Sequence, residues 1–496
     1  MPLTDFFDFW VASPEFFFWF SLALIFMFVT HDCNSLFFGY PILNEGLSLI
    51  SLFVILCTLV LTWTSHSTFF YIYNLFMLHD ELSFLAKIII LVISAIWILF
   101  TFKYNKMEKI HNFEFWILIM IGVGDMFFLV STVDIICLYL VLEIQALIFY
   151  ALTAFKKSSE FSTEAALKYF LLGSLSSVIL LFSLSLIYGL TGLTSYVEIG
   201  SFFHVCIWDG NLTTDGFKLS ILLLIIAFMF KLGVAPFHIW LPDVYEGAPS
   251  SITAFFATVY KFVICVVVFR TVIFWLFPVF DFVQQNFLLF IHFSLIIGSC
   301  GAFLQTKWKR FLAYSSIFHT GFLLLALTGG TLQSLESFFF YLIIYILTNV
   351  GFFSVFFCLV NCKRNIIIRY LSDLKMLFKT NQTLACSFII LLFSTSGIPP
   401  IAGFLAKFYV LFSVLSNNFF ILVLFCILFS CFSCFYYLRI IKTVCFEIVD
   451  RWSFYDKIDR SISILLAFIT LSLIFLFINL NSFILPFRLI ILSVTF

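Results

Sequence analysis

Residues 219–240 read LSILLLIIAFMFKLGVAPFHIW, an apolar run with a lysine and two helix breakers near its end. About 20 apolar residues are enough for a helix to cross the hydrocarbon core of a bilayer. Lys231 stands just before Gly233 and Pro236, the residues that interrupt the helix. A broken membrane helix is tolerated where its freed backbone lines a hydrated cavity. The stretch therefore predicts a broken membrane span with a cation beside the break.

A second stretch has the same form, and the rest of the chain is similarly apolar. Residues 384–415 contain Gly397-Ile-Pro-Pro-Ile-Ala-Gly403, followed by Lys407. Hydrophobic residues make up 63% of the 496 residues and charged residues 10%, whereas a soluble domain is roughly a quarter charged. This composition excludes a water-soluble fold. About fourteen apolar runs are long enough to span a bilayer, so we expect an all-α polytopic membrane protein in which two helices are broken.

The two breaks also predict how the chain is divided. Interrupted spans at corresponding places in two halves indicate an inverted-repeat transporter. We expect a first five-helix repeat in residues 113–275 and a second, inverted repeat in residues 284–442. Residues 1–112 would form an N-terminal three-helix segment, and residues 443–496 a C-terminal span and tail. Two unrelated proline kinks are the alternative.

The distribution of Lys and Arg predicts the orientation of the chain and isolates a group of buried cations. Short loops on the inner side of a membrane collect these residues. When the predicted spans are counted from the N-terminus, the loops after the odd-numbered spans hold most of the 26 Lys and Arg, so we expect these loops on the inner side. The loops on the opposite, outer side hold Lys218, Arg270 and Arg488. Because lysine can lose its proton and arginine stays charged, lysines inside spans favour proton transfer. The cations inside predicted spans are Lys87, Lys168, Lys231, Lys261 and Lys407.

Position within a span separates these lysines. Lys231, Lys261 and Lys407 lie deep in their spans or beside a break. A lysine at the centre of a bilayer costs about 2.5–3.5 kcal/mol, so we interpret all three as functional. Lys168 has an alternative, because Glu164 lies four residues earlier and can form a helix-end ion pair with it.

Other titratable residues fall within the predicted spans. Glu143 is the carboxylate in the middle of a span, and a Glu and a Lys that meet inside a membrane can exchange a proton. His238 and His319 can relay protons, although a lone histidine in a helix core is often only a hydrogen-bonded packing residue. Asp125 stays unassigned. So does Lys87, which is near the end of its span and can extend to the interface.

Several kinds of chemistry find no motif in the sequence. Its 13 cysteines are scattered, and the CxxC formed by Cys431 and Cys434 has no histidine or second pair nearby. The sequence has no HExxH, no phosphate-binding glycine loop and no basic run for nucleic acid. The first five residues lack the basic stretch of a cleaved signal peptide. We therefore expect no metal or redox cofactor in this chain, no nucleic-acid partner and no cleaved presequence.

Five segments resemble a known family. They are residues 142–145 (LEIQ), 160–173 (EFSTEAALKYFLLG), 230–249, 312–321 (LAYSSIFHTG) and 397–409 (GIPPIAGFLAKFY). These segments are similar to chain 2 of NADH:ubiquinone oxidoreductase, an antiporter-like subunit in the membrane arm of respiratory complex I. The resemblance extends over about residues 113–440. Chains 4 and 5 and the multisubunit sodium/proton antiporters share the general plan, but Lys407 and the short C-terminal tail favour chain 2.

The resemblance implies two inverted half-channels and a central axis of protonatable residues. Quinone chemistry elsewhere in the complex would change the pairing of Glu143 and Lys231, and a proton would pass along lysines and water to Lys407. NADH, FMN, iron-sulfur clusters and ubiquinone would be held by other subunits of this proton-translocating oxidoreductase. The resemblance places on the axis Glu143, Lys168, Lys231, His238, Lys261, His319 and Lys407.

The same resemblance implies partners and a location. The partners would be neighbouring antiporter-like and small core chains of the membrane arm, together with lipids such as cardiolipin. The absence of a presequence and the 75 phenylalanines, which suggest an AT-rich genome, favour an organelle-encoded chain in the mitochondrial inner membrane. The alternatives are a subunit of a multisubunit sodium/proton antiporter and a membrane scaffold whose buried lysines only hold helices together.

Overall fold

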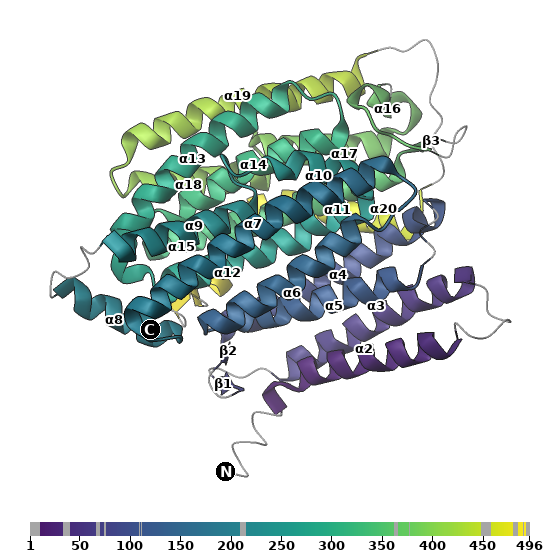
Figure 1. Cartoon of the computed structure of the whole chain (residues 1–496). Helices are drawn as coiled ribbons and strands as arrows, with labels where there is room; N and C mark the ends of the chain where they lie inside the picture. Colours follow the sequence, from purple (N-terminus) through teal and green to yellow (C-terminus); the bar gives the residue numbers. More distant parts are fainter. Residues whose placement is uncertain are drawn as a thin grey trace. The chain divides into compact units, whose positions relative to one another are not determined.

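The computed structural model describes residues 10–32, 40–65, 70–73, 76–108, 110, 112–208, 215–361, 366–375, 377–447, 458–479, 485–489 and 491–492. Within these ranges nearly all regular structure is helical (Figure 1). Two short antiparallel pairs of strands accompany the helices: β1 (Phe70–Ile72) with β2 (Met77–His79), and β3 (Val360–Asn361) with β4 (Ile366–Ile367). Twelve described helices are long and apolar enough to cross a membrane. The predicted class, an all-α polytopic membrane protein, is confirmed.

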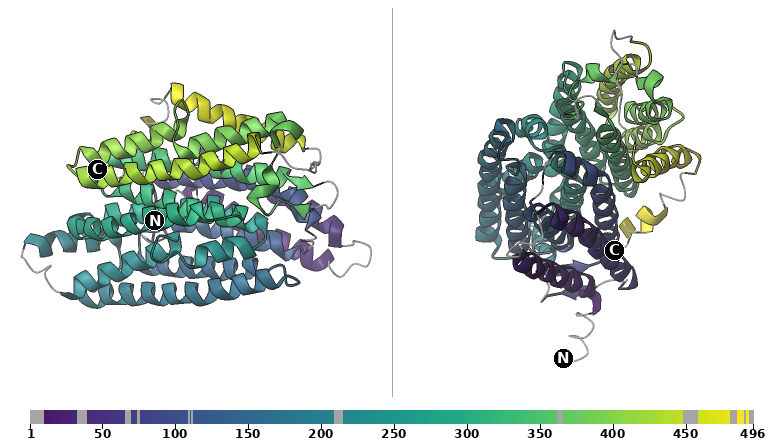
Figure 2. Two further views of the ribbon diagram at one scale, coloured as in Figure 1. Left: turned by 90° about the horizontal axis from the view of Figure 1, so that it is seen from above. Right: turned by 90° about the vertical axis from the view of Figure 1, so that its right-hand side faces the viewer.

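The chain divides into two compact units. The first comprises residues 1–232, 247–283 and 492–496. In this unit α7 packs against α9 and α3 against α4, while α2 and α3 run side by side (Figure 2). Its helices are α2 (Ser13–Asp32), α3 (Tyr40–Thr64), α4 (Glu81–Met107), α5 (Glu114–Ser131), α6 (Ile135–Thr153), α7 (Glu160–Thr191), α8 (Tyr196–Trp208), α9 (Asp215–Leu232), α11 (Ser250–Phe255), the π-helix η2 (Phe256–Tyr260), α12 (Lys261–Phe274) and the 3-10 helix η3 (Phe277–Val279).

The second unit comprises residues 233–246 and 284–491. Its centre is α15, which packs against α14, α17, α18 and α20 and is buried over most of its length. Its elements are α10 (Trp240–Gly247), α13 (Phe280–Phe303), α14 (Trp308–Leu327), α15 (Leu332–Cys358), the 3-10 helix η4 (Leu371–Leu374), α16 (Leu377–Thr380), α17 (Gln382–Ser396), α18 (Ala402–Leu415), α19 (Phe420–Cys445) and α20 (Arg460–Ile478).

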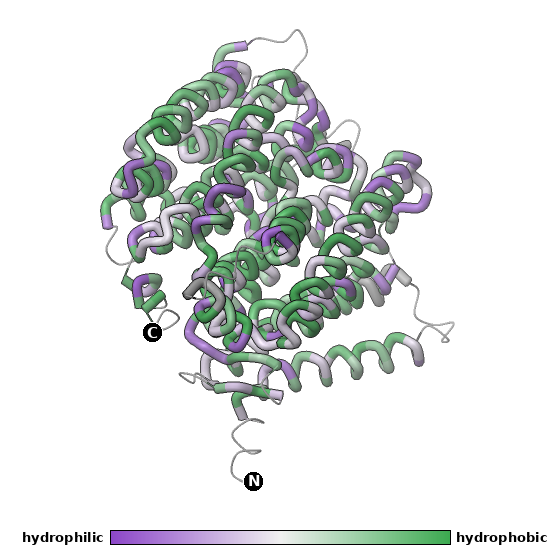
Figure 3. Tube along the Cα trace, turned by 60° about the vertical axis from the view of Figure 1, so that its left-hand side comes forward, coloured by the Kyte–Doolittle hydropathy of each residue, from purple (hydrophilic) through white to green (hydrophobic). Residues whose placement is uncertain are grey.

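Apolar helix bodies and polar helix ends explain why these segments form membrane helices. Green, hydrophobic residues dominate the helices in the hydropathy-coloured tube (Figure 3). At the start of α4, the Asp80 side chain accepts a hydrogen bond from the Ser83 backbone N–H, and the Ser83 hydroxyl oxygen accepts one from the Asp80 backbone N–H. Thr331 and Ser334 form the same reciprocal cap at the start of α15. Such caps satisfy backbone N–H groups that the first helical turn leaves without partners.

Both predicted breaks are present. The predicted span 219–240 covers most of α9, which ends at Leu232, then a non-helical turn and the start of α10. The predicted span 384–415 covers nearly all of α17 and all of α18, which have 15 and 14 residues and are separated at residues 397–401. Each half is shorter than the roughly 20 residues that a complete crossing needs. The total of fourteen crossings stays a prediction.

Two cations near span ends are buried and paired with carboxylates, whereas the sequence suggests that they are exposed. Lys87, expected to extend to the interface, is buried on α4 and forms an ion pair with Glu15 of α2. Arg270, expected in an outer loop, is buried on α12 and forms an ion pair with Asp80. Both expectations were wrong for one reason: hydropathy does not reveal that a carboxylate from another segment reaches the cation.

Candidate functional site

The end of α9 positions the first candidate lysine. Lys231 is the penultimate residue of α9 and is only 7% exposed. The helix stops because Gly233 has a φ of +70°, which favours glycine. A side chain at Gly233 would also stand 2.3 Å from the Leu241 side chain. The break thus holds a buried ammonium group in the last turn of a helix, where backbone carbonyls lack intrahelical partners.

Glu143 lies in the same unit as Lys231 and interacts with it electrostatically. It projects from α6, is half-buried, and is the charged group that acts on Lys231. Glu143 Oε1 is buried and finds no hydrogen-bond partner within the described part of the chain. Since a buried carboxylate oxygen normally has a partner, this atom is available to a proton or to water. The structure therefore brings together the predicted Glu and Lys.

Lys261 owes its position to a local change of helix type. The apolar segment of residues 250–274 is buried over nearly its whole length and changes from α11 to the π-turn η2 and then to α12. Lys261 is the first residue after the π-turn and is 3% exposed. One-turn π-helical insertions occur frequently at functional sites, because the extra residue shifts the faces of the helix.

A group of tyrosines that sequence reasoning missed lies in the first unit. Tyr150 lies seven residues after Glu143 on α6 and interacts electrostatically with it. Its ring is 4.9 Å from that of Tyr169, centroid to centroid, and Tyr169 forms a hydrogen bond with Tyr260. Gly173 makes room for this group, because a Cβ there would meet the Tyr150 hydroxyl at 2.1 Å. The i, i+7 spacing from Glu143 to Tyr150 was the available signal.

Lys168 lies in a different setting from the other candidate lysines. Its side chain is 43% exposed, and its Nζ lies 2.8 Å from Glu164 Oε1. This is the ion pair between residues four apart that the sequence left open as an alternative. The pair projects from α7 and is much more exposed than Lys231, which is buried. A place for Lys168 on the pathway stays a prediction.

His238 lies in the turn after the first break, within the second unit. It is half-buried, and its Nδ1 has no hydrogen-bond partner within the described residues. Its ring lies 6.4 Å from that of Tyr314 on α14. His238 is therefore close to α14, the helix that also carries His319.

The second break positions Lys407 directly. The Lys407 ammonium donates a hydrogen bond of 2.8 Å to the carbonyl oxygen of Ser396, the last residue of α17. Gly397 follows with a φ of +83°, and a Cβ there would lie 2.9 Å from Lys407 Cδ. The Nζ atom is 5.6 Å from the ring centroid of Phe318 and 5.7 Å from that of Phe322. A carbonyl and two aromatic faces thus stabilise a cation that is only 6% exposed.

His319 has partners on two other helices. Its Nδ1 lies 2.7 Å from the Tyr341 hydroxyl on α15, and its Nε2 lies 3.2 Å from the Tyr437 hydroxyl on α19. Tyr437 in turn forms hydrogen bonds with Ser315 and Thr395. The sequence singled out His319 but missed both tyrosines. Hydroxyl groups on both ring nitrogens form the continuous hydrogen-bonded path that a proton relay requires.

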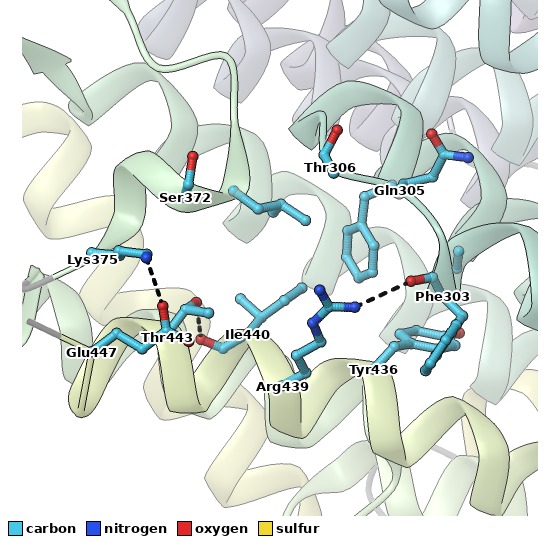
Figure 4. Close-up of a pocket in the computed structure, with 13 residues that line it drawn as sticks. Phe303, Gln305, Thr306, Ser372, Lys375, Tyr436, Arg439, Ile440, Thr443 and Glu447 are labelled. Carbon is cyan, nitrogen blue, oxygen red and sulfur yellow. Dashed lines mark hydrogen bonds and ion pairs between the residues drawn. The ribbon is translucent and has the colours of Figure 1, made fainter.

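One cavity in the second unit lies apart from these residues. It has a volume of about 250 Å³ and is lined by Lys375, Arg439 and Glu447, with Phe303 and Tyr436 on its apolar wall (Figure 4). Lys375 Nζ lies 2.9 Å from Glu447 Oε2. None of the seven candidate residues lines the cavity. It is therefore no part of the candidate proton path.

The chain is similar to membrane subunits of respiratory complexes. Residues 132–433 match the family described as NADH:quinone oxidoreductase/Mrp antiporter, transmembrane. NADH-ubiquinone oxidoreductase chain 2 of Marchantia polymorpha is 36% identical over 476 residues, which cover 95% of each chain. A chain of respiratory complex I from Thermus thermophilus is 25% identical, with a TM-score of 0.74 over 94% of this chain and 98% of that one.

A solved structure from another kind of complex shares the fold. A chain of the Mrp complex from Dietzia sp. DQ12-45-1b has a TM-score of 0.79 and covers 100% of this chain and 98% of its own length, at 16% identity. The fold alone is thus common to both kinds of complex. The sequence identity over nearly the full length decides between them, and it shows that the chain belongs to the NADH-ubiquinone oxidoreductase chain 2 family of antiporter-like membrane subunits.

Proposed function

We propose that this chain, as a proton-translocating subunit of the membrane arm of respiratory complex I, moves protons through its buried titratable side chains. One observation carries the proposal: each broken helix ends beside a buried lysine, Lys231 at the end of α9 and Lys407 on the last carbonyl of α17. Keeping ammonium groups in a membrane is costly and is associated with transport function. The side chains proposed for the path are Glu143, Lys168, Lys231, His238, Lys261, His319 and Lys407.

The first unit supplies a pair whose charges depend on each other. Lys231 is stabilised as a cation while Glu143 is negative, because opposite charges in a region of low dielectric attract strongly. When a signal from the rest of the complex neutralises or moves Glu143, that attraction is lost and Lys231 can release its proton. Lys261 is the next buried amine of the unit and can accept it through water.

The second unit supplies a relay and a terminal amine. The chain Tyr341–His319–Tyr437 passes a proton when His319 receives it on one ring nitrogen and gives up another from the opposite nitrogen. Lys407 then exchanges the proton with the outer side. The Ser396 carbonyl holds the Lys407 amine in place in both protonation states, because a neutral amine also donates a hydrogen bond.

The order of elements supports two repeats of five helices, residues 113–275 and 284–442. In both segments the third long helix is followed by a broken one: α7 precedes the break after α9, and α15 precedes the break after α17. A lysine stands beside each break. We propose that the repeats are inverted, as their order in a transporter of this kind requires. Residues 1–112 and 443–496 then flank the two repeats.

The redox chemistry belongs to other chains in this proposal. NADH, FMN, iron-sulfur clusters and ubiquinone act in other subunits, and this chain responds to their chemistry by moving protons. Its partners are other complex I subunits, and we propose neighbouring antiporter-like chains and cardiolipin among its contacts. We also propose the mitochondrial inner membrane as its location and an organelle gene as its source.

A sodium/proton antiporter subunit is the second candidate, because the Mrp complex chain shares the fold over its full length. The two candidates differ in what moves. If the chain is a complex I subunit, proton transport requires NADH oxidation and does not change when sodium is replaced by potassium. Sodium-dependent transport without NADH would support the antiporter reading.

The test uses the assembled complex in sealed vesicles, with the substitution Lys231→Ala. The variant should assemble and oxidise NADH, while proton transport per electron falls, because the amine that accepts the proton is gone. The matched control is Lys156→Ala, which removes a lysine that lies outside the spans and is about one-third exposed. Normal proton transport in the Lys231 variant would reject the proposed function.

A further inference from the structure

A cluster of buried charges lies in the first unit, at the ends of α2, α4 and α12. Lys87 Nζ lies 2.5 Å from Glu15 Oε1 and 3.4 Å from His79 Nδ1. Beside them, Arg270 Nη2 donates a hydrogen bond of 2.5 Å to Asp80 Oδ1. All five residues are at most 5% exposed. The path described above uses none of these groups.

Several buried polar atoms of the cluster have no hydrogen-bond partner among its own side chains. Glu15 Oε2, Asp80 Oδ2 and two guanidinium nitrogens of Arg270, Nε and Nη1, are buried and have no partner within the described residues. Buried polar atoms of this kind are normally satisfied by protein groups or by ordered water. Water molecules between the two ion pairs satisfy them best, because such a molecule can donate to the carboxylates and accept from the guanidinium.

The cluster lies at the end of the unit that the Lys and Arg distribution assigns to the outer side. Glu15 is near the start of α2, Lys87 is six residues into α4, and Arg270 is near the end of α12. At 1.5 Å per residue, Lys87 stands about 9 Å along α4 from its beginning. The charges thus extend from the outer end of the helices toward the middle of the membrane.

The helices that surround Lys87 also carry other titratable groups. α4 packs against α3, α5, α11, η2, α12 and β2. Besides the cluster itself, these elements bring Asp125 on α5, Tyr260 on η2 and Lys261 on α12, all of them buried. Lys261 and Arg270 stand on the same helix, about 14 Å apart along its axis. One helix therefore connects the proposed proton path to the outer cluster.

We propose that Glu15, His79 and Lys87 form a second outer proton-transfer site, in addition to the exit at Lys407, through which the first unit releases protons. The proposal rests on the proposed function of the chain. The Lys87 ammonium gives its proton to His79 Nδ1, which must be an acceptor when it faces an ammonium group. The imidazolium then releases the proton on Nε2, which is itself buried, to water that enters the cluster from the outer side. Neutral Lys87 takes the next proton from the interior, and Glu15 stabilises its charged form.

The alternative is a structural ion pair, and the substitution Lys87→Arg separates the two. Arginine keeps the positive charge and the contact with Glu15 but does not give up its proton in proteins. The complex that carries Lys87→Arg, in sealed vesicles, should assemble and oxidise NADH, with a loss of proton transport per electron. The matched control is Lys156→Arg, because Lys156 also pairs with a glutamate, Glu108, but is about one-third exposed.

Each outcome decides the question. If Lys87→Arg transports protons normally, the site is structural and the inference is overturned. If it does not assemble, the double substitution Glu15→Gln with Lys87→Met removes both charges while keeping similar volumes, and normal proton transport in that variant overturns the inference. Lys231→Ala is measured in parallel. Loss of transport there, with normal transport in Lys87→Arg, rejects the outer site and leaves the proposed function standing.

Discussion

The ammonium group of Lys407 caps a helix that the chain itself has broken, by donating a 2.8 Å hydrogen bond to the carbonyl oxygen of Ser396. Ser396 is the last residue of α17, so this carbonyl has lost its intrahelical partner. Cys434 Sγ also donates to the same oxygen, at 3.5 Å. A cation at the C-terminal end of a helix is favourable because that end carries partial negative charge. The break and the lysine thus stabilise each other.

Gly397 should be indispensable to this arrangement. Alanine at this position would have to adopt a φ of +83°, and its Cβ would stand 2.9 Å from Lys407 Cδ. We expect Gly397→Ala to lower the free energy of unfolding by about 1–3 kcal/mol, the usual cost of such a backbone conformation. The thermal stability of the purified complex and the amount assembled should both fall.

Gly189 provides the control for this substitution. It lies in α7, has no positive φ, and an added Cβ there would meet no atom within 4 Å. Gly189→Ala should leave assembly unchanged or slightly improved, because alanine favours a helix by about 0.5–1 kcal/mol over glycine. Equal behaviour of the two variants would show that the break at Gly397 does not depend on glycine.

The hydrogen bond between His319 and Tyr341 should be needed for transport and dispensable for assembly. Tyr341→Phe keeps the buried ring and removes only the hydroxyl that lies 2.7 Å from His319 Nδ1. Removing one partner of a buried hydrogen bond costs about 1–3 kcal/mol of stability. We expect the variant to assemble, because the phenylalanine ring keeps the packing around it. Proton transport per electron in vesicles should fall, and Tyr188→Phe, at a residue that is 53% exposed, should leave it normal. A normal ratio in Tyr341→Phe would remove His319 from the path.

Local signals explain what the sequence could predict. Membrane helices, their breaks and the lysines beside Gly233 and Gly397 are visible in short stretches, because hydropathy and helix breakers act within about 20 residues. Lys231 and Lys407 could be singled out as candidates for this reason. Glu143 could be singled out because a carboxylate in an apolar run is conspicuous.

Partners that come from distant parts of the chain explain what was missed. Arg270 and Asp80 are 190 residues apart, Lys87 and Glu15 are 72 apart, and His319 and Tyr437 are 118 apart. A charge near the end of an apolar run is typical of a loop, unless tertiary packing brings a counter-ion to it. Tyrosine gives no clear signal, since its ring suits an apolar core and its hydroxyl a polar one.

The Asp80–Arg270 pair should show how costly an unmatched buried charge is. Arg270→Met leaves Asp80 buried without its counter-ion, which typically costs about 3–5 kcal/mol. The double variant Asp80→Asn with Arg270→Met should recover much of that loss, because no charge is left buried. Thermal unfolding of the purified complex measures both. The control is Lys156→Met, at a residue that is about one-third exposed, and it is expected to cost about 0–1 kcal/mol. A double variant as unstable as the single one would mean that the pair is not coupled.

Glu143→Gln should separate the charge of this residue from its shape. The amide has nearly the size of the carboxylate, so packing around α6 should persist, but the negative charge that acts on Lys231 is gone. Without that charge, the interaction with Lys231 can no longer be switched on and off, and the change in pairing that is proposed to drive transport is lost. NADH oxidation should continue while proton transport per electron falls. Glu198→Gln is the control, because Glu198 is exposed on α8 and lies outside the proposed path. If the two variants transport protons equally well, Glu143 does not control Lys231.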